Sequence, residues 1–189
     1  MLRKLIAVVT AGAVIATAPV VHASEPVECS TLFSAGYQGV SHGLPNPGSI
    51  LNYNADQTRI AAETVKQVDA YAKVCDEIKI VGYSYGAAVV HTALETIDTR
   101  PYAGKVHVIL YGNPRHPGGI EDFNLTDIPG VGFRGAGIVP QNLGSFADNC
   151  NPRDAICDFP YRNPIKSIDH IIGYFTGAHK YPDLIKEIA

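Results

Sequence analysis

The stretch Ile78-Lys79-Ile80-Val81-Gly82-Tyr83-Ser84-Tyr85-Gly86-Ala87 decides the fold of this 189-residue chain. Its apolar beginning predicts a strand, and the residues after Gly86 carry apolar side chains at helical spacing. Ser84 lies between them, at the apex of a sharp turn whose flanking glycines allow strained dihedrals and a close strand-to-helix approach. An ordinary strand-to-helix connection is the alternative, but this context favours a nucleophilic serine at the edge of a sheet, as in serine hydrolases.

The rest of the chain predicts an α/β fold, a three-layer α/β/α sandwich with a central, mostly parallel sheet. The expected strands are 32–33, 49–53, 77–81 and 105–111, and the expected helices are 58–74 and 87–97. Strands separated by helical stretches pair in parallel, because a parallel crossover needs about a dozen residues. Residues 112–144 are rich in Gly and Pro but also apolar, so we expect an ordered loop there.

The amino terminus predicts export. A short basic start is followed by an almost wholly apolar run and by Val21-His22-Ala23, so residues 1–23 are expected to be a signal peptide. A membrane anchor is the alternative, but Thr, Gly and Pro interrupt the run. Residues 24–189 then form one domain. Without Arg3 and Lys4 its net charge is about −5, which argues against nucleic acid as a partner.

Four cysteines in an exported chain predict two disulfides. Cys150 and Cys157 enclose a short, turn-rich loop, whereas Cys29 and Cys75 each lie beside a predicted strand of one sheet. We therefore expect the pairs Cys29–Cys75 and Cys150–Cys157. A metal site is disfavoured because no Cys-x-x-Cys pair and no histidines at ligand spacing occur.

A serine nucleophile needs a histidine to accept its proton and an acid to orient that histidine. The chain order Ser, acid, His of such hydrolases excludes His42. Packing or surface positions are expected for three later histidines: His91, His107 and His116. His170, where a loop enters the last helical stretch, is preferred over His179, which is expected in an exposed turn.

The acid has four candidates: Asp148, Asp154, Asp158 and Asp169. Asp154 lies inside the small cysteine loop, which would hold it rigidly. Asp169 adjoins His170, and adjacent side chains rarely orient each other in this way.

At this point the chain resembles the cutinase family of serine esterases. The resemblance rests on Gly82-Tyr83-Ser84-x-Gly86, a cysteine nine residues before the serine, the Cys150-x3-Asp154-x2-Cys157 loop, and a histidine followed by an apolar stretch and a tyrosine. These features run in the family's order through most of residues 24–189. The resemblance implies a Ser84-Asp154-His170 triad, both disulfides, an acyl-enzyme intermediate and no cofactor.

The resemblance also implies an oxyanion hole made by the backbone N–H groups of Tyr37 and Tyr85. Both residues depart from the family's pattern, which has a small hydroxyl residue and a glutamine at these positions. The 111–119 segment is more similar to actinobacterial cell-envelope esterase domains and phage mycolyl esterases. We therefore expect a secreted, monomeric carboxylesterase for lipid or polyester substrates, with peripheral contact to lipid or cell envelope. A non-catalytic lipid-binding or envelope-binding domain on the same scaffold is the alternative.

Overall fold

The computed structural model describes residues 28–35, 53–122 and 134–188. They contain a parallel sheet in the order β1-β2-β3-β4. Its strands are β1 (Glu28–Ser34), β2 (Glu77–Tyr83), β3 (Val106–Tyr111) and β4 (Ser145–Asn149). Because all strands run in one direction, their carboxyl ends meet at one edge of the sheet, where sites of α/β proteins form.

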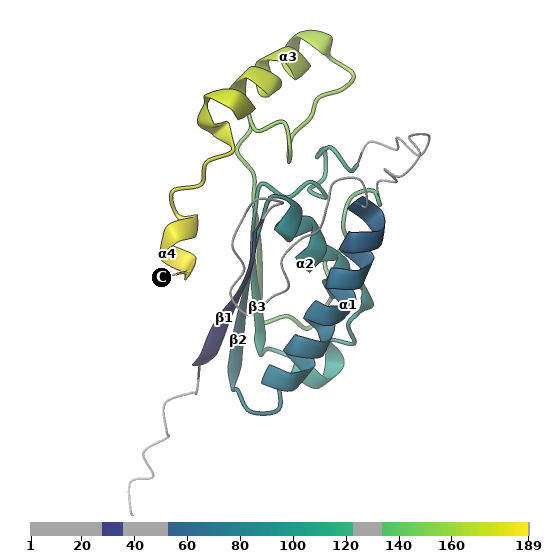
Figure 1. The fold of residues 1–189 in the computed structure, drawn as a ribbon, viewed down its shortest axis with the longest axis vertical. Coiled ribbons are helices and arrows are strands. Elements are labelled where there is room, and N and C mark those ends of the chain that lie inside the picture. Colours follow the sequence, from purple (N-terminus) through teal and green to yellow (C-terminus); the bar gives the residue numbers. More distant parts are fainter. Residues whose placement is uncertain (1–27, 36–52, 123–133, 189) are drawn as a thin grey trace, which may run out of the picture.

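Two long helices cover one face of the sheet (Figure 1). They are α1 (Tyr53–Tyr71) and α2 (Tyr85–Thr96), which connect β1 to β2 and β2 to β3. Right-handed crossovers between strands that follow one another in order place both helices on the same side. The main core lies beneath them, with Leu32, Ile80, Val90, Val108 and Leu110 all essentially inaccessible to solvent.

The opposite face carries the short carboxyl-terminal helix α4 (Leu184–Ile188) (Figure 1). Leu184 and Ile188 pack against a second core cluster that contains Phe33 and Val81. An ion pair of 2.8 Å between Lys79 Nζ and Glu187 Oε2 adds to this contact. The chain is therefore an α/β/α sandwich whose second helical layer is thin.

Helix α3 (Pro164–Gly173) and the π-turn η3 (Tyr174–Ala178) stand beyond the carboxyl ends of the strands (Figure 1). Asn163 caps α3 by accepting a hydrogen bond from the Lys166 backbone, and proline opens its first turn. A 3-10 turn, η2 (Arg100–Tyr102), precedes β3. No helix of the described residues is long and apolar enough to cross a bilayer.

The predicted elements around the serine are confirmed to within a few residues, whereas β4 was not predicted. Residues 145–149 are partly polar and alternate between exposed and half-buried positions at the edge of the sheet, so they lack a strong strand signal. The described parts of the 112–144 loop form turns without regular elements. The predicted leader, residues 49–52 of the predicted 49–53 strand, Tyr37 and the side chain of Cys29 lie outside the described residues. Tyr53, the last residue of that predicted strand, instead begins α1.

Candidate active site

Ser84 occupies a strained turn between β2 and α2. Its φ of 55° and ψ of −128° are unusual for a residue with a Cβ. The turn is held by hydrogen bonds from Ser84 N to Tyr111 O and from the Ala87 and Ala88 amides to Ser84 O. The predicted strand-turn-helix around the serine is thus confirmed, with strain concentrated on the serine itself.

The two glycines of the motif are required by close packing. A Cβ on Gly82 would lie 2.7 Å from Ala87 Cα, and one on Gly86 would lie 2.1 Å from the Ser34 carbonyl oxygen. Backbone atoms cannot move aside as a flexible side chain can, so both positions exclude any larger residue. Without side chains at these two positions, α2 packs closely against β1 and β2.

Asp154 makes several polar contacts at the site. It is fully buried, and its Oδ2 lies 2.6 Å from His179 Nδ1 and accepts a 2.7 Å hydrogen bond from the Tyr181 hydroxyl. Oδ1 accepts a hydrogen bond from the Ile156 backbone N–H. A carboxylate at 2.6 Å assigns the proton of neutral His179 to Nδ1, which leaves Nε2 as a proton acceptor.

His179 lies at the same edge of the sheet as Ser84. Its ring stacks on Tyr83, the residue before the serine, with ring centroids 5.0 Å apart, and Tyr83 donates a hydrogen bond to the His179 carbonyl. A Cβ on Gly112, just after β3, would meet His179 Cε1 at 2.6 Å. Nε2 of His179 is buried and makes no hydrogen bond within the described part of the chain.

The structure places His170 differently from the predicted Asp154–His170 pair. His170 Nδ1 lies 2.7 Å from the backbone oxygen of Asp158, and 3.7 Å from its Oδ2. Helix α3 turns His170 toward the end of the cysteine loop. The helical segment then kinks at Gly177, whose φ is 111°, and His179 beyond the kink contacts Asp154. The pairing prediction is corrected on this ground: Asp154 contacts His179.

Tyr181 is a residue of the site that the sequence reasoning missed. Its hydroxyl donates to Asp154 and accepts from the Asn151 N–H at 3.2 Å, and burial raises its pKa well above the usual range. The neutral phenol therefore stays a hydrogen-bond donor to the carboxylate. The available signal in the sequence was the spacing of Gly177, His179 and Tyr181.

The disulfide Cys150–Cys157 is present, as predicted. It closes the loop that carries Asp154, whose backbone N–H donates to Asn151 O. Cys75 is also disulfide-bonded, and β1 pairs with β2 beside it. Its predicted pairing with Cys29 stays a prediction because the Cys29 side chain is outside the described residues.

Tyr85, one of the two predicted oxyanion donors, is the first residue of α2. Its backbone N–H therefore belongs to the positive end of the helix dipole, next to Ser84. The Tyr85 ring packs away from this end, in a buried cluster with Ile60 and Val89. The second predicted donor, Tyr37, lies outside the described residues.

His91 and His116 belong to a separate, largely buried polar network around Asn113 and Asp148. Asn113 Nδ2 lies 2.9 Å from His91 Nδ1 and 3.0 Å from Asp148 Oδ2, and His116 Nδ1 lies 3.1 Å from the same oxygen. Burial lowers the pKa of His91, whereas the hydrogen bond with Asp148 raises that of His116. His107 Nδ1 lies 3.0 Å from Ser145 Oγ. These contacts agree with the expected packing roles.

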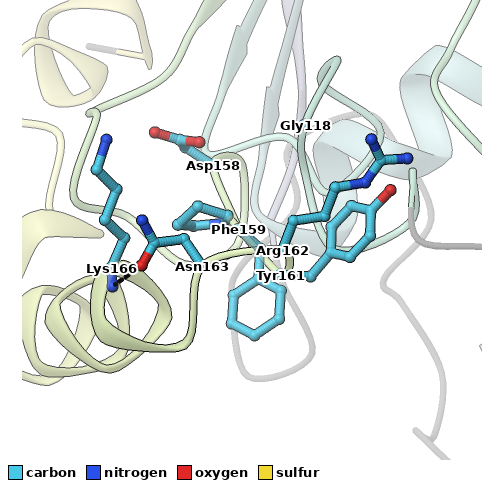
Figure 2. Close-up of a pocket in the computed structure, with 8 residues that line it drawn as sticks. Gly118, Asp158, Phe159, Tyr161, Arg162, Asn163 and Lys166 are labelled. Atoms are coloured by element: carbon cyan, nitrogen blue, oxygen red, sulfur yellow. Dashed lines mark hydrogen bonds between the residues drawn. The ribbon is translucent and has the colours of Figure 1, made fainter.

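An open hollow of about 300 Å³ lies beside the start of α3 (Figure 2). Gly118 and residues 158–163 line it together with Lys166. It adjoins the loop that His170 anchors. The described residues contain no group of three or more His, Cys, Asp or Glu side chains that could hold a metal ion.

Comparisons with known proteins place these features in a family. The family model named Cutinase matches residues 10–185. A cutinase of Trichoderma harzianum, cut1, is 30% identical over 74 residues, which are 38% of this chain and 30% of the relative. A cutinase of Hypocrea jecorina is 26% identical over 86 residues, which are 44% of this chain and 35% of the relative. The aligned stretches thus span about a third of the curated relatives' length.

A solved structure, Trichoderma reesei cutinase in complex with a C11Y4 phosphonate inhibitor, has a TM-score of 0.44 and 16% identity. That comparison covers 85% of this chain and 76% of the other. The family model covers far more than half of the chain and includes Ser84, Asp154 and both histidines. The chain belongs to the cutinase family.

Proposed function

We propose that this protein is an exported carboxylic-ester hydrolase that uses Ser84, His179 and Asp154 as its catalytic triad. The observation that carries the proposal is the 2.6 Å contact between His179 Nδ1 and buried Asp154, at the sheet edge where Ser84 is held in a strained turn. Membership of the cutinase family supports the reaction class. The histidine differs from the one expected from sequence, because His170 contacts Asp158 instead.

In the proposed reaction, Ser84 Oγ attacks the acyl carbonyl of an ester while its proton passes to His179 Nε2. The imidazolium that forms is stabilised by Asp154, whose negative charge is fully buried and therefore weakly screened. The Tyr85 N–H at the start of α2 stabilises the oxyanion, and we keep Tyr37 N–H as the second donor. His179 then protonates the leaving alcohol, giving an acyl-enzyme.

Deacylation repeats these steps with water as the nucleophile. His179 accepts a proton from water, hydroxide attacks the acyl carbon, and the proton returns to Ser84 as the acid leaves. No cofactor takes part in this sequence. Tyr83 and Tyr181 flank the imidazole, so they restrict its rotation during both proton transfers.

The proposed substrates are lipid or polyester esters, and the proposed location is extracellular. The named relatives are cutinases, and the Cys150–Cys157 disulfide fits an oxidising compartment. We further propose that the protein acts as a monomer that meets lipid or cell envelope peripherally. Residues 1–23 are proposed to be removed as a signal peptide.

The test is hydrolysis of p-nitrophenyl esters, with short and long acyl chains, by the purified protein and by Ser84→Ala. We expect serine-dependent turnover, which falls by at least about a thousandfold in the variant, with an unchanged circular dichroism spectrum. A fluorophosphonate probe should label the natural protein and not the variant. Undiminished turnover in Ser84→Ala would end the proposal, and absence of both turnover and labelling would favour a lipid-binding domain.

A further inference from the structure

Helix α3 presents its apolar side to solvent. Ile165 is 82% exposed, Ile168 59% and Ile172 50%, and Phe175 in the following π-turn is 80% exposed. At 3.6 residues per turn these four side chains lie on one side of the helical segment. We call Ile165, Ile168, Ile172 and Phe175 the α3 apolar face.

The side of α3 that packs onto the protein is the polar one. His170 is buried against Asp158, and Gly173 fits so closely that a Cβ would lie 2.3 Å from the Arg153 carbonyl oxygen. Beside this packed side, the exposed Asp169 forms two hydrogen bonds to the Arg153 guanidinium. A surface helix normally packs its apolar side against the protein, whereas α3 exposes that side to solvent. Clustered exposed apolar side chains mark interaction sites.

We propose that the α3 apolar face docks onto a lipid surface with anionic headgroups. This inference deepens the proposed function, on which it rests, because it names how the enzyme meets an ester held in a lipid layer. Helix α3 stands beyond the carboxyl ends of the strands, the edge at which Ser84 follows β2 (Figure 1). It also lies in the chain between Asp154 and His179.

Charge complementarity favours lipid over a second copy of this chain. Between residues 158 and 180 the cations Arg162, Lys166 and Lys180 are all exposed, and of the two carboxylates there, Asp169 is already paired with Arg153. A symmetric contact between two copies through this face would bring these like charges together. Cations beside exposed Ile and Phe are typical of helices that lie in the headgroup region.

The start of the helix adds an interfacial tyrosine. Tyr161 is 46% exposed, and the Arg162 guanidinium lies 5.3 Å from its ring centroid (Figure 2). Such amphipathic side chains place an apolar body in the acyl region and a polar tip in water. They extend the α3 apolar face toward the hollow of Figure 2.

The test is cosedimentation of the purified protein with vesicles of equimolar phosphatidylcholine and phosphatidylglycerol. The test variant is Ile168→Ser/Ile172→Ser/Phe175→Ser, whose partition coefficient we expect to fall by at least about tenfold, since three apolar contacts are lost. The matched control is Val74→Ser/Ile138→Ser/Ile185→Ser, which removes three exposed apolar side chains elsewhere. The control should bind like the natural protein.

A second variant, Arg162→Gln/Lys166→Gln, tests the charge argument. It should bind phosphatidylglycerol vesicles more weakly, and added salt should weaken binding of the natural protein more than that of the variant. Equal binding of the natural protein to pure phosphatidylcholine would overturn the anionic part of the proposal.

The outcomes separate this inference from the esterase proposal. Turnover of a water-soluble p-nitrophenyl ester should be unchanged in the α3 triple variant, because the triad is untouched. No vesicle binding by the natural protein, or equal loss in the control, would overturn the docking inference while leaving the esterase intact. A natural dimer that becomes monomeric in the α3 variant would assign the face to a second copy and overturn it as well.

Discussion

At the scale of single residues, the site depends on which histidine contacts Asp154. Replacing His179 with Ala should lower kcat for a p-nitrophenyl ester by at least about a thousandfold, because the base and the partner of Asp154 are both lost. His170→Ala is the matched variant, since His170 is equally buried but contacts the Asp158 backbone. We expect its kcat to stay within about tenfold of the natural value. The measurement is steady-state kinetics of both variants.

If kcat instead fell much further in His170→Ala than in His179→Ala, His170 would be the base and His179 would be removed from the proposal. Thermal unfolding of both proteins serves as the control. Replacing a histidine that only packs should lower the unfolding temperature but leave kcat nearly unchanged at a temperature where the fold is intact.

At the scale of elements, the 150–157 loop holds Asp154, which contacts the proposed base His179. The double variant Cys150→Ala/Cys157→Ala removes the crosslink without leaving a free thiol. For a loop this short, loop-closure entropy predicts a loss of about 2 kcal/mol in the free energy of unfolding. We also expect kcat to fall, because Asp154 is held by contacts within the same loop. Urea unfolding and steady-state kinetics give the two quantities.

A fall in stability with unchanged kcat would contradict the link between this loop and catalysis. It would mean that the Tyr181 and His179 contacts position Asp154 without the crosslink. Turnover should be compared well below the unfolding transition of the variant, so that loss of folded protein is not read as loss of activity.

At the scale of the whole molecule, buried polar contacts join α2, the loop after β3 and β4. Arg115, only 2% exposed, pairs with Glu95 of α2 at 2.7 Å and also donates to the Thr92 hydroxyl and Gly135 carbonyl. Asn113 connects His91 to Asp148 in the same way. These contacts fix a loop with little regular structure, because a buried charge or amide left unpaired would be costly.

His116 makes the stability of this assembly depend on pH. Its pKa is raised from 6.5, chiefly by the hydrogen bond with Asp148. The folded protein then binds the proton more tightly than the unfolded chain, so this contribution is complete below 6.5 and is lost as pH rises through the folded pKa. The measurement is the free energy of unfolding of the natural protein minus that of His116→Gln. This difference should decrease as pH rises above about 6.5.

This difference in the free energy of unfolding separates the contribution of His116 from that of His91. His91 has a lowered pKa and acts with the opposite sign, but it is present in both proteins. A difference that stays constant or increases with pH would show that Asp148 does not stabilise charged His116.

The strand-turn-helix around Ser84 and the small cysteine loop could be predicted because both are local. A serine between two glycines, after a buried strand and before an apolar helix, allows few backbone paths. Two cysteines seven residues apart can close a loop without help from the rest of the fold. The helices and central strands followed from apolar periodicity for the same reason.

Only the tertiary structure decided which histidine meets the acid and which strand closes the sheet. His170 lies within α3 and His179 follows it after the kink at Gly177, yet it is the more distant residue, His179, that reaches Asp154. Strand β4 is held by its register with β3 rather than by its own polar sequence. By itself, then, the sequence determined the family of the chain and the strand-turn-helix that carries Ser84, whereas long-range packing selected the histidine that contacts Asp154, since no local pattern encodes a contact across 25 residues.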